Sequence, residues 1–475
     1  MNSSESPLEL SGEQLQQLVD AAMARIIPHI DSLPEQPSAD IEGAAELARS
    51  LVEPVPQKGA PLDEVLDLVF NKALPKSFNT AGPGYLAYIP GGGIPHAAVA
   101  DLIADAVNRY VGVWLAAPGL SQLEANVVRW LCEIMGYGPE SLGFLTSGGS
   151  LANFSAVVTA RRTLLPDDFL GGTIYASDQV HHSIQKAAML AGFPADAVRE
   201  VGSDELFRIR LDELEQRIAE DRVAGRTPFL IVASAGTTNT GAVDDFNALA
   251  DLAEPNRMWL HVDGAYGGFF MLTERGRTVM RGIERADSIV LDPHKGMFLP
   301  YGTGSLLVRD GSTLRRAHTV FADYMPAMQN AEDLVDFCQI SPELSRPFRG
   351  LAVWLPIKLL GIEPFRANLD EKLDLAQWAR DQLRSIDGVE ILAEPQLSIV
   401  AFRLTAPGLE TKSLNELNRN LMAQVNASKR VYLTGTMLGD RFAIRICVLS
   451  FRTHADRMEM GLEDIRHAVE AMSRG

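Results

Sequence analysis

A lysine at the end of an apolar segment is the residue best suited to covalent chemistry in this chain of 475 residues. Residues 288–296 read as a buried strand that ends in His294 and Lys295 and then turns on a glycine. Because burying an ammonium group is costly, a lysine held at such a place usually has a chemical task. A desolvated lysine has a lowered pKa and can form a Schiff base with a carbonyl compound. The alternative is a lysine whose ammonium group simply reaches solvent.

A second apolar segment, residues 259–263, ends in Asp263 and is followed by small residues that leave room for a flat ligand. About one strand–helix–strand unit separates Asp263 from Lys295, so both side chains can reach the same edge of one sheet. A lysine that forms an imine and a carboxylate that keeps a pyridine nitrogen protonated are two requirements of pyridoxal phosphate. The alternative for Asp263 is a helix cap or a bond to local backbone.

Other strand ends carry groups that a phosphorylated cofactor needs. Residues 143–150 lead into an unbroken helical pattern, and small residues at a helix start expose backbone N–H groups to an anion. The spacing fits neither a Walker loop nor the Rossmann glycine pattern. A strand at 174–177 precedes His181 and His182, and a strand at 229–234 opens into a hydroxyl-rich loop. Consecutive β-α units thus supply a lysine, a carboxylate, an anion cradle and a histidine.

These motifs resemble the group II pyridoxal-phosphate-dependent amino acid decarboxylases, the family of aromatic L-amino acid and glutamate decarboxylases. The resemblance extends from about residue 12 to the end of the chain. It implies an α/β protein of fold type I, similar to aspartate aminotransferase, with a mostly parallel sheet in its large domain. The motifs that carry the resemblance are residues 146–150, 177–181, 236–238, 261–266 and 292–295.

The same resemblance implies a division into an N-terminal helical arm (1–85), a large cofactor-binding domain (86–365) and a small C-terminal α+β domain (366–475). In the family, the arm embraces a second subunit, so we expect a homodimer with the active site at the interface.

By position in these motifs, Lys295 would form the imine and Asp263 would pair with the pyridine nitrogen. His181, rather than His182, would stack on the ring, and Ala265 would pack on its other face. The remaining contacts to pyridoxal 5'-phosphate would come from Gly148, Gly149, Ser150, Thr237, Thr238, Asp292 and His294.

The resemblance implies that an L-amino acid loses CO2 and becomes an amine. Many members donate the final proton from a loop tyrosine, and Phe337 occupies that position here. Two outcomes follow: oxidative deamination to an aldehyde, or plain decarboxylation with a proton from Tyr324, His318 or water. We rank decarboxylation first because His181, which also separates the two activities, is retained.

Tyr88 occupies a position that contacts the substrate side chain in the family, and Val113 and Trp114 lie in a region that reaches across the dimer. This apolar lining favours an aromatic or bulky apolar substrate. An aminotransferase of the same fold would clamp the substrate carboxylate with an arginine. Arg349 and Arg445 are the candidates, although either could pair with an acidic neighbour. A carbon–carbon lyase and a non-enzymatic cofactor-binding protein are further alternatives.

The composition agrees with a cofactor enzyme. A net charge of −18 argues against a nucleic acid or an anionic membrane as partner. The three cysteines form neither a disulfide framework nor a metal-ligand spacing, so we expect no metal and a reducing cytoplasm. We see no signal peptide and no apolar run long enough to span a bilayer.

The elements that position these residues can be outlined from periodicity. We expect helices at 12–32, 40–52 and 62–71, and then a Gly- and Pro-rich loop at 82–95. Alternating strands and helices run to about residue 312, which predicts a mostly parallel sheet. Residues 316–345 read as a mobile loop, and one long helix at 350–388 would lead into the small domain.

Overall fold

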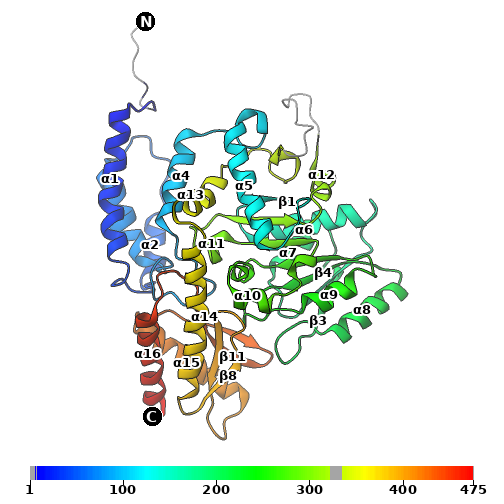
Figure 1. The fold of residues 1–475 in the computed structure, drawn as a ribbon. Coiled ribbons are helices and arrows are strands. Elements are labelled where there is room, and N and C mark those ends of the chain that lie inside the picture. Colours follow the sequence, from blue (N-terminus) through cyan, green and yellow to red (C-terminus); the bar gives the residue numbers. More distant parts are fainter. Residues whose placement is uncertain (1–5, 7, 321–333, 474–475) are drawn as a thin grey trace.

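The computed structural model describes residues 6, 8–320 and 334–473. The chain starts with helices α1 (Gly12–Asp31), α2 (Ala44–Ser50) and α3 (Leu62–Asp67), none of which has a buried residue. Helix α1 begins with a capping box, in which Ser11 and Gln14 satisfy each other's backbone N–H groups. Figure 1 shows α1 at one margin of the molecule, away from the strands.

A seven-stranded sheet forms the centre of the large domain, in the order β1-β7-β6-β5-β4-β2-β3. Strand β7 is antiparallel to both of its neighbours, and the other pairings are parallel. The carboxyl ends of β1, β2, β4, β5 and β6 therefore lie at one edge of the sheet. The strands are β1 (Leu142–Thr146), β2 (Gly172–Ser177), β3 (Val198–Val201), β4 (Thr227–Ser234), β5 (Trp259–Asp263), β6 (Ser288–Leu291) and β7 (Gly304–Val308).

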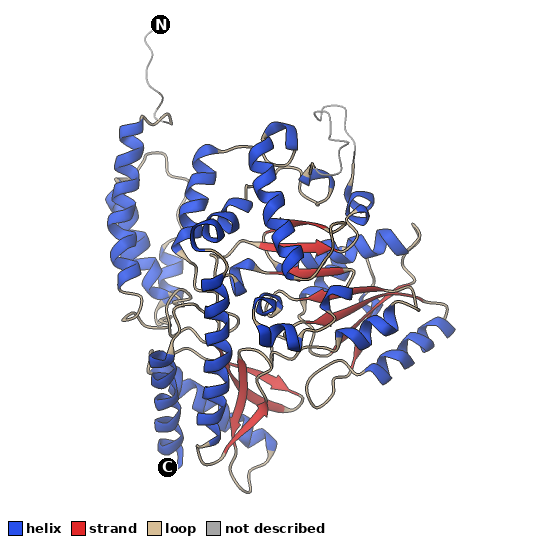
Figure 2. Ribbon diagram, in the orientation of Figure 1, coloured by secondary structure: helices blue, strands red, loops and turns tan. Residues whose placement is uncertain are grey.

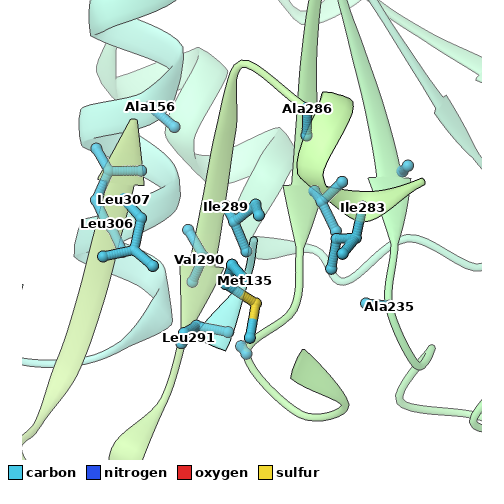
Figure 3. Close-up of a cluster of buried hydrophobic side chains, with 14 of the residues drawn as sticks. Met135, Ala156, Ala235, Ile283, Ala286, Ile289, Val290, Leu291, Leu306 and Leu307 are labelled. Atoms are coloured by element: carbon cyan, nitrogen blue, oxygen red, sulfur yellow. The ribbon is translucent and has the colours of Figure 1, made fainter. Parts of the chain in front are cut away.

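Helices pack around this sheet, so the central strands are continuous apolar runs rather than alternating ones. Figure 3 shows Ile289, Val290 and Leu291 of β6 beside Leu306 and Leu307 of β7, all fully buried. The helices of this region are α4 (Pro95–Val107), α5 (Pro118–Ile134), α6 (Gly149–Leu164), α7 (Ser183–Leu190), α8 (Leu211–Val223), α9 (Phe246–Ala253), α10 (Glu274–Val279), α11 (Pro293–Gly296) and α12 (Ser312–His318).

A smaller antiparallel sheet, in the order β10-β11-β9-β8, has a core of its own. Figure 2 shows it below the larger sheet, with long helices beside it. Its elements are β8 (Val389–Ala393), β9 (Ile399–Leu404), α15 (Thr411–Ala427), β10 (Thr434–Leu438), β11 (Arg441–Cys447) and α16 (Ala455–Ser473).

The prediction of a single long helix at 350–388 is wrong. The structure has two helices there, α13 (Gly350–Leu360) and α14 (Glu363–Arg384). Gly361 separates them with a φ of +72°, a left-handed conformation that glycine adopts at no steric cost. The composition also changes at this break, from the mostly apolar α13 to the amphipathic and more polar α14.

The central part of the expected mobile loop, including Tyr324, lies outside the described residues. Helices lie before and after this part of the chain. Helix α12 ends at His318, and a 3-10 helix, η7, spans Phe337–Gln339. Phe337 is fully buried in the main core.

Among the described residues, no helix is both long enough and apolar enough to cross a membrane.

Candidate active site

The strand ends meet around a cavity of about 280 Å³ at the carboxyl edge of the large sheet. All the cofactor-binding residues expected from the sequence line this cavity, although they come from five separate β-α junctions. They are Gly148, Gly149, Ser150, His181, Thr237, Thr238, Asp263, Ala265, Asp292, His294 and Lys295.

Lys295 lies in the one-turn helix α11 rather than at the end of the strand. Its Nζ atom is 2.9 Å from Oδ2 of Asp292, one turn earlier. Burial lowers the pKa of Lys295, but the negative charges of Asp292 and Asp263 outweigh burial and leave the pKa above its usual value. The expectation of a lowered pKa is therefore wrong for the protein without its cofactor, where the lysine is an ammonium ion.

Asp263 is held by two hydrogen bonds. Oδ2 accepts from Nδ2 of Asn153 at 2.9 Å, and Oδ1 accepts from the backbone N–H of Ala265 at 3.1 Å. Since neither donor carries a charge, the carboxylate can pair with a cationic ligand group.

The ring of His181 is fixed by Ser183. Nδ1 of His181 lies 2.8 Å from Oγ of Ser183 and 3.3 Å from its backbone nitrogen. Burial lowers the pKa of His181, although Asp263 opposes this shift, so the imidazole is neutral near pH 7. The rings of His181 and His182 are 4.4 Å apart, and His182 is not among the residues that line the cavity.

The start of helix α6 forms an anion cradle. No side chain caps this helix, so its first N–H groups are available to a ligand. A Cβ atom on Gly149 would lie 3.0 Å from Oδ2 of Asp292 and 3.2 Å from Cβ of Ala265, so a side chain there would crowd the cradle. Nδ1 of His294 donates to the carbonyl of Thr303 at 2.7 Å, which leaves Nε2 for the ligand.

The site also contains residues that the sequence reasoning missed, above all Asn153 and Ser183. Asn153 lies one turn after Gly149 on helix α6, so it faces the same way as the cradle. That spacing could have revealed it. Tyr266 also lines the cavity, and its hydroxyl contacts Ser398, which directly precedes β9 of the smaller sheet, so the two domains meet near the site.

Among the described residues, three that were proposed to contact the substrate or supply a proton, Tyr88, Phe337 and His318, do not line this cavity. Tyr88 is half-exposed and has a φ of +49°. The ring of Phe337 lies 4.8 Å from the guanidinium of Arg346, in the core. His318 contacts Thr159, ten residues into α6 from the cradle, which corresponds to about 15 Å along the helix.

The two arginines considered as carboxylate clamps are already engaged. Arg349 forms two hydrogen bonds with the carboxylate of Glu343, at 2.7 and 2.9 Å. Arg445 is buried and donates to backbone carbonyls, including those of Asn239 and Tyr88. Neither guanidinium faces a substrate carboxylate in this arrangement.

A family model described as the pyridoxal-dependent decarboxylase conserved domain matches residues 46–405. The chain belongs to this family. It is 34% identical over 468 residues to the aromatic-L-amino-acid decarboxylase of Bacillus atrophaeus, with 98% of each chain covered.

Two solved structures give the same result for the fold. The Oryza sativa TDC structure with PLP and tryptamine is similar with a TM-score of 0.92 and 25% identity, over 98% of this chain and 99% of that chain. Catharanthus roseus tryptophan decarboxylase in complex with L-tryptophan has a TM-score of 0.91 and 25% identity, over 98% of this chain and 100% of that chain.

Family membership confirms fold type I, pyridoxal phosphate as the cofactor and amino acid decarboxylation as the reaction. The residues around the cavity fit the cofactor, because they offer a lysine, a carboxylate and an uncapped helix start. The curated relatives favour release of an amine over the aldehyde-forming alternative.

Proposed function

We propose that the chain decarboxylates an aromatic L-amino acid to the corresponding amine and CO2. One observation carries the assignment of the site: Lys295 and Asp263, from neighbouring β-α junctions, line one cavity together with the uncapped start of helix α6. The aromatic substrate class is supported by relatives named for aromatic amino acids and for tryptophan.

Pyridoxal phosphate, when bound, supplies the electron sink that accepts the electrons of the breaking Cα–carboxylate bond. Lys295 would hold the cofactor through Nζ and release it to the substrate amine. Asp263 would accept a hydrogen bond from the pyridine nitrogen and keep that nitrogen protonated. His181 and Ala265 would cover the two faces of the ring and exclude water.

The phosphate group would bind at the start of helix α6. Backbone N–H groups of Gly149 and Ser150 and the hydroxyl of Ser150 are the donors we assign to it, and His294 would contact it from the side of Nε2. Gly148 allows the backbone to approach closely, and the hydroxyls of Thr237 and Thr238 extend the set on the facing loop. Asp292 would orient Nζ of Lys295 through their ion pair.

We propose that the protein is a homodimer. Helix α1 has no buried residue and exposes Leu15, Leu18 and Ile27, although it is amphipathic. Helix α4 exposes Val99, Leu102, Ile103 and Val107 in the same way. A second copy would cover this apolar surface. Replacing Leu102 and Ile103 by lysine should shift sedimentation toward a monomer, and an unchanged dimer would contradict this interface.

The division at residues 85 and 365 also remains a proposal. It is supported by two separate cores, one around the large sheet and one that joins Leu383, Phe402 and Ile444 of the small domain.

A cytoplasmic location is supported by Cys132, Cys338 and Cys447, which are free and buried as in a reducing compartment.

Borohydride reduction tests the site assignment. Reduction of the holoenzyme should fix a phosphopyridoxyl group on the peptide that contains Lys295, as measured by mass spectrometry after digestion. Lys372 is a matched control, because its side chain is fully buried but outside the cavity. A label elsewhere, or none, would disprove the role of Lys295.

A substrate panel tests the reaction. Purified enzyme should release CO2 and amine in equal amounts from an aromatic L-amino acid, without peroxide. Aldehyde, ammonia, amine and peroxide should be measured together over the twenty amino acids. Turnover of glutamate but of no aromatic amino acid would reject the proposed substrate class.

A further inference from the structure

A buried hydrogen-bond network runs from the core of the large sheet to the two ligand-facing groups of the cavity. Nε1 of Trp259 lies 2.8 Å from Oγ of Ser288, which lies 2.7 Å from Nδ1 of His261. Nε2 of His261 lies 2.9 Å from Oδ1 of Asn153. From Nδ2 of Asn153 the network branches to Oδ2 of Asp263 and to Oγ of Ser183, each at 2.9 Å.

The direction of each bond follows from the chemistry of two members. Asn153 turns Nδ2, which can only donate, toward Asp263 and Oδ1, which can only accept, toward His261. Since that amide oxygen can only accept, His261 carries its proton on Nε2. His261 is fully buried, and burial lowers its pKa to about 4, so the ring is neutral and Nδ1 accepts from Ser288. Trp259, which can only donate, completes this end.

The second branch, through Ser183, determines which ring nitrogen of His181 carries the proton. Ser183 accepts a hydrogen bond from Asn153, so its own hydroxyl hydrogen is free to be donated to Nδ1 of His181. The backbone N–H of Ser183 points to the same nitrogen, which independently marks Nδ1 as an acceptor. A neutral His181 must therefore carry its proton on Nε2, the ring nitrogen left for the ligand.

We propose that Asn153 is the positioning residue that couples the two ligand-facing groups: its single amide orients the side chain of Asp263 and, through Ser183, fixes His181 as an Nε2–H donor. The roles of Asp263 and His181 toward the cofactor rest on the proposed function, whereas the hydrogen-bond directions do not. Nε2–H of His181 thus donates a hydrogen bond to the substrate rather than accepting one.

The network is complete at its branch point, which explains why an asparagine suits position 153. Both amide hydrogens and the amide oxygen of Asn153 have partners, and the residue is buried. An aspartate of the same shape would accept from Ser183 instead of donating to it, and would repel Asp263. A leucine would leave the Nε2–H group of His261 without a partner, at the cost of an unsatisfied buried donor.

The directions can be tested on the apoprotein. Solid-state 15N NMR on protein labelled at histidine distinguishes protonated from unprotonated ring nitrogens, and His181→Gln and His261→Gln variants assign the two signals. We expect both rings to be neutral with protonated Nε2 and unprotonated Nδ1. A proton on Nδ1 of His181 or His261 would overturn the proposal, whatever the outcome of borohydride labelling at Lys295.

Two variants separate the branches. Asn153→Asp should lower kcat by about 10- to 100-fold, as is typical for residues that orient a reacting group, weaken cofactor binding and produce some His181 with protonated Nδ1. Ser183→Ala should lower kcat and weaken cofactor binding less than Asn153→Asp does, because it cuts only the His181 branch and keeps the hydrogen bond from Asn153 to Asp263. If Asn153→Asp kept the wild-type kcat and the wild-type tautomer of His181, the proposed coupling of Asp263 to His181 through Asn153 would be refuted.

Asn418→Asp is the matched control for the change at position 153. Asn418 is a fully buried asparagine of the small domain that bonds to the backbone of Leu404. Its replacement should lower thermal stability without changing the tautomer of His181. An equal tautomer change in this control would mean that the effect at position 153 is general destabilisation, and would reject the proposal.

Discussion

Nζ of Lys295 lies 2.9 Å from Oδ2 of Asp292, and this ion pair keeps the lysine protonated until the cofactor arrives. The pKa of Lys295 is raised, because Asp292 and Asp263 together outweigh the effect of burial. Removing one of these charges should therefore lower the pKa and increase the fraction of free amine near neutral pH.

We predict that Asp292→Asn shifts the pH dependence of imine formation to lower pH. The rate should be followed by absorbance with pyridoxal and with pyridoxal phosphate. An equal shift with both aldehydes reports the lysine, whereas a shift with the phosphate alone would mean that Asp292 acts on the phosphate. Asp287→Asn, at a residue paired with Arg309, is the control and should leave the profile unchanged.

Gly91 explains the position of the loop that leads to Tyr88. A Cβ atom at residue 91 would lie 2.0 Å from the carbonyl oxygen of His294, next to Lys295. Gly91→Ala should therefore displace either the loop or helix α11, lower the free energy of unfolding by about 1–3 kcal/mol and reduce cofactor affinity.

Gly138→Ala is the control for this prediction, because nothing lies within 4 Å of an added Cβ there. Its free energy of unfolding in urea should change by no more than about 0.5 kcal/mol. If Gly91→Ala were as stable as this control, the contact with His294 would not constrain the loop.

The positions of the cavity residues could be predicted from the sequence because the relevant signals are local. Strands β5 and β6 are apolar runs that end in an aspartate and in a Pro-His-Lys turn, and parallel strands present their carboxyl ends at one edge. The hydrophobic pattern therefore determines which side chains meet, even though Asp263 and Lys295 belong to different units.

The hydrogen-bond partners could not be predicted in this way. Asn153 and Asp263 are 110 residues apart in the sequence, and their contact depends on how deeply α6 packs against the end of β5. The same limit applies to Phe337, whose side chain packs under Arg346 rather than facing the cavity. Its expected role came from its position in the sequence, and a position does not determine where a side chain points.

A buried ion pair between Arg346 and Glu124 attaches the segment that follows Phe337 to helix α5. Arg346 and Glu124 have no exposed side-chain surface, Arg346 also donates to the carbonyl of Leu145, and Glu124 accepts from the N–H of Gly350. Arg346→Met leaves a buried carboxylate without its counter-ion, so the free energy of unfolding should fall by about 3–5 kcal/mol.

The double variant Glu124→Gln, Arg346→Met should recover most of this loss in urea unfolding. The glutamine still accepts the hydrogen bond from Gly350 but carries no buried charge. If the double variant were as unstable as the single one, the lost contacts of Arg346 would explain the effect rather than the unpaired charge.

The last prediction concerns acid stability. Burial, with a smaller effect of Arg162, lowers the pKa of His318 to about 4, whereas a histidine in the unfolded chain titrates near 6.5. Between these values the unfolded state binds a proton that the folded state does not, so stability is full above about pH 6.5 and falls as the pH is lowered toward 4. His318→Asn should remove up to about 1.4 kcal/mol per pH unit from the slope in this window. Urea unfolding at pH 5 and 6 measures that slope, and His96→Asn, at an exposed histidine, is the control. An equal slope in wild type and His318→Asn would show that His318 is protonated in the folded protein.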